Sequence, residues 1–116
     1  MAVVGTYFVV YVTDMDRATA FYQNAFGADV KFASPHWTSL TIAGVQMGLH
    51  YADPEDVGPI GLGFDIDDMD AACQAVESAG GRVVKAPEAR PEEGITIATV
   101  ADTEGNEFSV TLAKSR

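Results

Sequence analysis

His50 is the residue best suited to acid–base chemistry in this chain, because a neutral imidazole can accept a proton near pH 7. Tyr7 and Tyr11 could donate phenolic hydrogen bonds to a ligand carbonyl, or simply fill space. The other histidine, His36, follows Pro35 at a predicted strand boundary, where we expect an exposed loop. The alternative for His50 is a wall residue that hydrogen-bonds a neighbour or a water molecule.

Two carboxylates and one indole are the next candidates for ligand binding. Asp65 and Glu107 would create a negative potential suited to an amine or a guanidinium group. The alternative places Asp65 at a solvated strand end and Glu107 at a rim. Trp37, the single tryptophan, offers a stacking surface for a planar ligand. No nucleophile, base and orienting group stand together in a recognisable catalytic pattern.

The length and composition of the chain argue against some classes of function. The chain has 116 residues and a net charge of −10, from 7 basic and 17 acidic residues. This length predicts a single domain, 1–116, and the acidic balance argues against nucleic acid as a partner. The apolar run Val3 to Val12 lacks a cationic leader and is too short to span a membrane, so it predicts a strand. The single cysteine, Cys73, fits a reducing, cytoplasmic location.

An internal repeat organises the sequence. Asp68-Met69-Asp70 lies 54 residues after Asp14-Met15-Asp16, and each triplet precedes an alanine-rich helical pattern and a glycine. Asp14 and Asp68 stand where an N-cap carboxylate would accept backbone amides. The first module spans about 1–53 and the second about 58–116, and each follows the order strand, helix and three strands.

The remaining elements follow from alternation and turn residues. We expect strands at 4–13, 29–35, 37–43 and 45–52 in the first module, and at 59–67, 82–86, 95–101 and 106–113 in the second. Ala43-Gly44 and Glu104-Gly105 predict tight turns. The segment Ala86 to Gly94, with two prolines and four charged residues, predicts a mobile loop.

Three segments resemble the vicinal-oxygen-chelate superfamily, which includes glyoxalases and bleomycin-resistance proteins. They are residues 11–22 (YVTDMDRATAFY), 63–70 (GFDIDDMD) and 101–108 (ADTEGNEF), the last similar to the family's Asp-Pro-Asp-Gly-Asn turn. The resemblance covers nearly the whole chain. It implies an α+β fold in which two βαβββ modules form a cupped, eight-stranded mixed sheet with the helices outside.

The resemblance, combined with the two-residue period of a strand, also implies which side chains face the ligand cavity. We expect this set to bind the ligand: Tyr7, Tyr11, Trp37, Gln46, His50, Asp65, Glu107 and Ser109. Residues of the opposite parity, such as Val10 and Phe64, would face the helices. Cys73 lies on the core stripe of the second helix, so we expect it to be inert.

Relatives that bind a divalent ion hold it with His or Glu on the first and last strands of each module. The matching positions here are Tyr7, Gly48, Gly61 and Ser109, none of which offers an imidazole or a carboxylate. The resemblance therefore predicts that the metal ligands are lost, and we expect no cofactor. A relocated ion site built from His50, Asp65 and Glu107 is the remaining metal-dependent alternative.

Three functions are compatible with these observations. The first is a metal-independent binding protein, homodimeric like the bleomycin-resistance branch, that sequesters a cationic or aromatic compound such as an antibiotic. The second is a metal-independent lyase or isomerase that uses His50 or Tyr7 as acid or base. The third is a relative by fold alone, whose partner is another protein.

Overall fold

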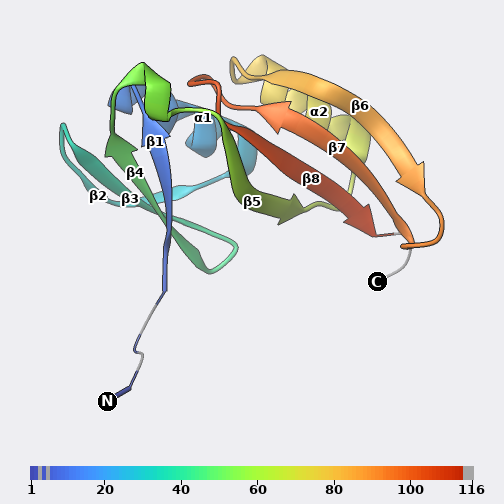
Figure 1. Cartoon of the computed structure of the whole chain (residues 1–116), viewed down its shortest axis with the longest axis horizontal. Coiled ribbons are helices and arrows are strands. Elements are labelled where there is room, and N and C mark those ends of the chain that lie inside the picture. Colours follow the sequence, from blue (N-terminus) through green and yellow to red (C-terminus); the bar gives the residue numbers. More distant parts are fainter. Residues whose placement is uncertain (3, 5, 114–116) are drawn as a thin grey trace.

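The computed structural model describes residues 1–2, 4 and 6–113, so Gly5 of the first predicted strand lies outside the described residues. The chain folds as two βαβββ units (Figure 1). The first unit contains β1 (Phe8–Val12), α1 (Met15–Phe26), β2 (Asp29–Ala33), β3 (Trp37–Ile42) and β4 (Val45–Tyr51). After a 3-10 turn, η1 (Pro54–Asp56), the second contains β5 (Pro59–Asp65), α2 (Met69–Ser78), β6 (Arg82–Arg90), β7 (Ile95–Ala101) and β8 (Glu107–Ala113). The predicted α+β class and its two modules are confirmed.

Each unit builds its own mixed sheet. The strand orders are β1-β4-β3-β2, the first sheet, and β5-β8-β7-β6, the second sheet. In both, the first strand runs parallel to the last strand of its unit, and the other pairs are antiparallel. Between residues 6 and 113 no strand of one sheet pairs with a strand of the other. As a result β1 and β5 are both edge strands.

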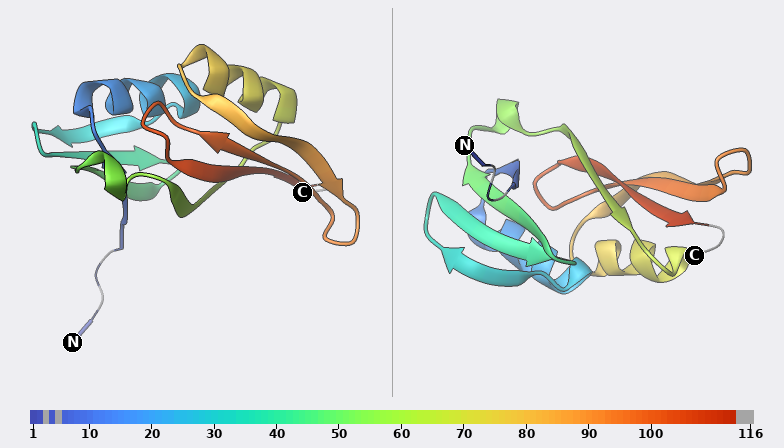
Figure 2. Two further views of the ribbon diagram at one scale, coloured as in Figure 1. Left: turned by 45° about the horizontal axis from the view of Figure 1, so that its top comes forward. Right: turned by 90° about the horizontal axis from the view of Figure 1, so that it is seen from below.

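Both helices begin as the repeat predicts. The Asp14 carboxylate accepts the amide of Arg17 at 3.0 Å, and the Asp68 carboxylate accepts the amide of Ala71 at 3.0 Å. Each bond satisfies an amide that the first helical turn leaves without a partner. α1 ends at Gly27, whose φ of 67° is the left-handed conformation that glycine adopts without strain. The two helices lie on the same side of the molecule (Figure 2).

The hydrophobic core fills the space between the helices and the sheets. Strand residues of one parity are buried there, among them Val10, Leu40 and Leu49 of the first sheet. The hydrophobic side of α1 packs onto these strand residues. Phe26, the last residue of α1, contacts the second sheet, with its ring centroid 4.6 Å from that of Phe64. The two units therefore share one core, and the opposite face of each sheet is left without a helix.

A single carboxylate, that of Glu104 in the β7–β8 turn, joins the second unit to the start of α1. It accepts the backbone amides of Thr13 and Asp14 at 3.0 and 2.8 Å, and the guanidinium of Arg17 at 2.7 Å. Burial raises the pKa of Glu104, but hydrogen bonds from Arg17, Asp14, Thr103 and Thr13 outweigh it, so the pKa lies below its ordinary value. Glu104 is therefore held as a carboxylate between the two units.

A second polar contact lies buried beside Glu104. The Asp102 carboxylate accepts the Tyr22 hydroxyl at 2.8 Å and both the backbone amide and the side-chain amide of Asn106. The same Asn106 side chain donates to the carbonyl of Tyr11 at 2.8 Å. Burial, followed by the charge and the hydrogen bond of Asp102, raises the pKa of Tyr22 well above its usual range. These buried polar groups are therefore satisfied across the boundary between the units.

The predicted loop at residues 86–94 is wrong in its first half. β6 continues to Arg90, and its register against β7 shifts between Val83 and Lys85 and again between Lys85 and Glu88. Pro87, which has no amide hydrogen, lies inside the second irregularity of an edge strand. Proline is tolerated in such a place because no ladder bond is lost. The chain therefore reverses direction only between Arg90 and Ile95.

Candidate functional site

Seven residues share the face of the first sheet that carries no helix, which we call the open face. They are Tyr11, Trp37, Ser39, Thr41, Gln46, Gly48 and His50. The strand register shows this directly, because Trp37 pairs with His50, and Ser39 with Gly48. Most of their neighbours along each strand are buried in the core, as the two-residue period requires, whereas Val45 and Tyr51 at the two ends of β4 are exposed.

Four rings follow one another across this face: Tyr7, Trp37, His50 and Tyr11, which we call the aromatic row. The ring centroids of Tyr7 and Trp37 are 6.1 Å apart at 87°, and those of Trp37 and His50 are 6.1 Å apart at 84°. The rings of His50 and Tyr11 are 5.8 Å apart at 75°. Edge-to-face contacts of this kind are favourable and leave ring surface available for a planar ligand.

Trp37 is held in this row by two contacts. Its indole N–H donates to the Ser39 hydroxyl at 2.8 Å. Its six-membered ring lies against the backbone of Gly48, so closely that a Cβ at residue 48 would overlap the ring. Gly48 is one of the four positions at which the resemblance led us to expect a metal ligand in relatives that bind an ion. In this chain the indole occupies the space that a ligand side chain would need.

His50 is oriented by the backbone. Its Nδ1 lies 2.6 Å from the carbonyl oxygen of Tyr51. A carbonyl can only accept, so Nδ1 carries the hydrogen in this contact. A neutral His50 then presents Nε2 as an acceptor, and the side chain is exposed. The ring is therefore suited to accept a hydrogen bond or a proton from a molecule on the open face.

The other three predicted site residues belong to the second sheet. Ser109 pairs with Gly63, Glu107 with Pro59, and Asp65 with Thr111. Asp65 is exposed, whereas Glu107 and Ser109 are half-buried. The structure thus groups Tyr11, Trp37, Gln46 and His50 on the first sheet, with Tyr7 just before β1 and its ring against Trp37, and it places Asp65, Glu107 and Ser109 on the second sheet.

The relocated metal site does not form within the chain. His50 lies on the first sheet, while Asp65 and Glu107 lie on the second. Within the described part of the chain, no three His, Cys, Asp or Glu side chains gather closely enough to hold an ion. Gly48, at a former ligand position, is covered by Trp37. Among the described residues, the side chains of the open face therefore do not fit a divalent ion.

Two cavities lie along the open face of the first sheet, one at each end of the Trp37–His50 pair. The first, of about 200 Å³, is lined by Tyr7, Lys31, Trp37, Gln46 and neighbouring residues of β3 and β4. The second, of about 390 Å³, is lined by Tyr11, His50, Tyr51, Ala52, Asp53 and Asp56. Sequence reasoning missed Lys31, Asp53 and Asp56, because it placed Lys31 only in a strand and the two aspartates only in a linker.

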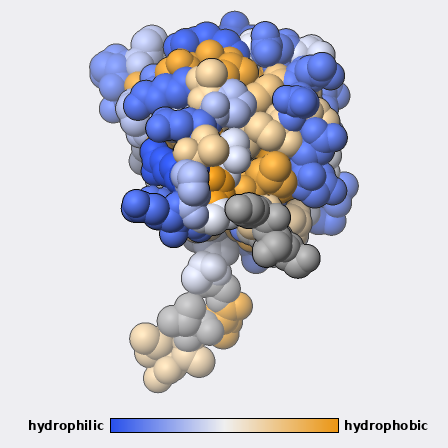
Figure 3. All heavy atoms as spheres, turned by 90° about the vertical axis from the view of Figure 1, so that its right-hand side faces the viewer, coloured by the Kyte–Doolittle hydropathy of each residue, from blue (hydrophilic) through white to orange (hydrophobic). Residues whose placement is uncertain are grey.

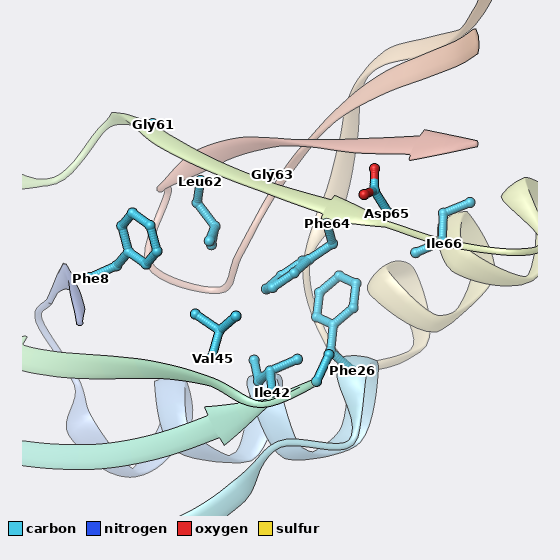
Figure 4. Close-up of a pocket in the computed structure, with 11 residues that line it drawn as sticks. Phe8, Phe26, Ile42, Val45, Gly61, Leu62, Gly63, Phe64, Asp65 and Ile66 are labelled. Atoms are coloured by element: carbon cyan, nitrogen blue, oxygen red, sulfur yellow. The ribbon is translucent and has the colours of Figure 1, made fainter. Parts of the chain in front are cut away.

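A third cavity, an apolar groove of about 550 Å³, runs between the two sheets. The side chains of Phe8 and Val45 from the first sheet converge there with those of Leu62 and Phe64 from β5 (Figure 4). Phe8 is 53% exposed and Val45 48% exposed. Farther out, the end of the molecule nearest β6 and β7 is mainly hydrophilic, with a few hydrophobic side chains between the charged ones (Figure 3).

Cys73 and the helices contribute no further chemistry to the open face. Cys73 is half-buried on α2, and burial raises the pKa of its thiol, which lowers its reactivity near neutral pH. In the described part of the chain, neither helix is long and apolar enough to cross a membrane.

The two-unit fold and its open face are those of a small vicinal-oxygen-chelate protein, and sequence comparison agrees. Residues 6–110 match the Glyoxalase/Bleomycin resistance protein/Dioxygenase superfamily, and the chain belongs to this superfamily. A comparison with curated proteins found no match.

Solved structures share the fold. The fosfomycin resistance protein FosX from Listeria monocytogenes, complexed with Mn(II) and sulfate, is 20% identical with a TM-score of 0.82; the match covers 97% of this chain and 92% of that one. FosX from Mesorhizobium loti is 18% identical with a TM-score of 0.78, covering 97% and 94%. A glyoxalase/bleomycin resistance protein/dioxygenase family enzyme from Burkholderia phytofirmans is 23% identical with a TM-score of 0.75, covering 92% and 96%.

Proposed function

We propose that this protein binds a small aromatic compound on its open face without a metal ion, as a sequestering protein of the superfamily. The observation that carries the proposal is the aromatic row. Trp37 stands at its centre, fixed by Ser39 and by contact with Gly48, so the stacking surface is preorganised. The indole also fills the space beside a former metal-ligand position.

A cationic group on the ligand would be accommodated at the His50 end of the row. The cavity there is lined by Tyr11 and by Asp53 and Asp56, whose carboxylates attract an amine. This location differs from the one expected from the sequence, which relied on Asp65 and Glu107. A ligand that contacts the aromatic row could also contact Asp65 and Glu107 only if a second copy of the chain placed its second sheet beside this face.

A homodimer is part of the proposal. The edge strands β1 and β5 leave backbone donors and acceptors without a strand partner, and the apolar groove opens beside both. A second copy that covered Phe8 and Val45 would remove this surface from water. It would also bring the second sheet of one chain toward the open face of the other. We further expect a reducing, cytoplasmic location, because Cys73 is the single cysteine.

Trp37 fluorescence tests the binding proposal, since the chain has no other tryptophan. A panel of planar compounds, with and without amine groups, is titrated into the protein with excess chelator. We expect saturable quenching for at least one compound, an unchanged dissociation constant without the chelator, and full recovery of the unmodified compound afterwards. Binding that is lost with the chelator and restored by a divalent ion would show that the metal-independent proposal is wrong.

A metal-independent enzyme is the second candidate, favoured by the orientation of His50. With Nδ1 committed to the Tyr51 carbonyl, Nε2 is the basic atom on the open face. Such an enzyme would convert a carbonyl compound, and His50→Ala would reduce its rate by about 100-fold or more. In the sequestering protein, the same substitution changes affinity alone and no product accumulates. Product analysis during the titration therefore separates the two candidates.

A further inference from the structure

The smaller cavity on the first sheet combines an ammonium group with an aromatic wall. We propose that it is a subsite for a carboxylate-type anion attached to the aromatic ligand, with Lys31 as its charged partner. This inference rests on the proposed function and specifies the chemistry of one end of the ligand. The cavity, of about 200 Å³, has room for a single ring with its acidic substituent.

The backbone of β2 places Lys31 at this cavity. Val30 pairs with Leu40, but Phe32 pairs with Ser39, so Lys31 is an extra residue in the ladder between β2 and β3. Such a bulge re-aims side chains, and bulges are common beside binding sites. Lys31 lines the cavity together with Tyr7, Trp37 and Gln46. A charged side chain is thus combined with two aromatic rings and an amide.

The charge of Lys31 is available for a ligand. Within the described part of the chain, its ammonium group forms no ion pair or hydrogen bond with another side chain. Only two of the seven basic residues, Arg17 and Lys31, precede residue 82, and Arg17 is committed to Glu104. Among the described basic side chains of the first unit, Lys31 is therefore the one left to bind an anion.

The net charge of −10 limits where on this protein an anion can bind. A strongly acidic protein repels small anions at long range, so an anion would bind only where a local cation and a stacking surface act together. At the other end of the row, Asp53 and Asp56 line the cavity beside His50. The open face thus carries opposite charges at its two ends, and it fits an amphoteric aromatic molecule better than a purely cationic one.

The indole N–H resonance of Trp37 reports on this subsite, because it is the single tryptophan signal in a proton–nitrogen NMR spectrum. Benzoate, benzamide and benzylamine are titrated separately against the purified protein at low salt. These probes share a ring and differ in charge. We expect benzoate to bind about two- to fivefold more tightly than benzamide, as for an exposed ion pair, and this preference to weaken at high salt.

Matched variants test whether the preference for benzoate comes from the charge of Lys31. Lys31→Met keeps the length of the side chain and should abolish the preference for benzoate, whereas Lys31→Arg should retain it. Lys85→Met, on exposed β6 of the second sheet, removes the same charge and should change nothing. Because Lys31 and Lys85 are both exposed, neither variant should disturb folding, and the free indole resonance checks this.

The outcomes separate the two proposals. If no probe shifts the Trp37 resonance, the aromatic site itself is wrong, and the anion subsite falls with it. If all three probes bind equally, or if Lys31→Met keeps the preference for benzoate, the aromatic site stands and the anion subsite is wrong. Acetate, titrated alone, should leave the resonance in place, because the ring supplies part of the affinity.

Discussion

The indole ring of Trp37 covers the α-carbon of Gly48 on the neighbouring strand, and the two residues fit only as a pair. A side chain at residue 48 and the observed position of the indole exclude each other. Because Trp37 also contacts Tyr7 and His50, the absence of a side chain at residue 48 determines the shape of the whole aromatic row.

Gly48→Ala tests this pairing. We expect the indole to be displaced, its hydrogen bond to Ser39 to be lost, and the free energy of unfolding to fall by about 1–2 kcal/mol. The emission of Trp37 and its quenching by ligand should change together. Gly61→Ala is the matched control, because an added Cβ there meets no atom within 4 Å. Equal emission spectra and equal urea midpoints for both variants would contradict the pairing.

Tyr22→Phe tests the buried contact between the units. Losing the hydroxyl bond to Asp102 should cost about 1.5–3 kcal/mol in urea unfolding, since the acceptor is a charged, buried group. The raised pKa of Tyr22 also has a consequence at alkaline pH. Its contribution to stability is complete below the unfolded pKa of about 10 and is lost as the pH rises through the higher folded value.

The alkaline comparison therefore uses both proteins across pH 7 to 11. The native protein should lose stability steeply at the upper end, and Tyr22→Phe should show a shallower decline. Parallel curves would mean that the stability loss comes from other groups. Tyr51→Phe serves as the control because Tyr51 is 48% exposed.

Glu104→Gln tests the carboxylate that joins the two units. We expect a loss of about 1–3 kcal/mol at neutral pH, because a neutral amide cannot accept this set of bonds as strongly. Since the folded pKa of Glu104 is lowered, its contribution is complete above the unfolded value of 4.5 and disappears as the pH falls through the folded value. Urea midpoints measured from pH 7 to 3 should converge for the two proteins, and a constant gap would refute this role.

Phe8→Asp tests the homodimer. We expect the native protein to elute as a dimer at micromolar concentration, with its mass measured by light scattering, and the variant to elute as a monomer. The reason is that a carboxylate in the apolar groove would be buried without a partner. Val30→Asp, at the exposed edge strand β2 and outside the groove, should remain dimeric. Equal masses for the native protein and Phe8→Asp would exclude the groove as the interface.

The fold was predictable from the sequence because it depends on local signals that the repeat presents twice. The sequence predicts the helix caps at Asp14 and Asp68 and the alternation of β3 and β4. This alternation alone groups Trp37, Gln46 and His50 on one face. Two features of the structure could not be predicted from the sequence. The bulge at Lys31 breaks the two-residue period, and the division of the strands into separate sheets depends on packing between units.

The site was only half predictable for the same reason. Period-two reasoning says which face a residue occupies, but not which residues meet across a distance. It could not show that Trp37 covers Gly48, because that contact depends on a rotamer. Asp65 and Glu107 were expected on the same cavity face as His50, and the structure places them on the second sheet while His50 lies on the first. The charged residues near the aromatic row are instead Lys31, Asp53 and Asp56.

Glu104 also bears on how the protein is made. Its partners Thr13 and Asp14 lie about ninety residues earlier in the chain, at separations of 91 and 90. During synthesis the helix at the start of the chain emerges long before the carboxylate that anchors it. The first unit therefore lacks this anchor until the turn that carries Glu104 has left the ribosome. Truncation within the last strand or the turn before it should accordingly damage the beginning of the protein as much as its end.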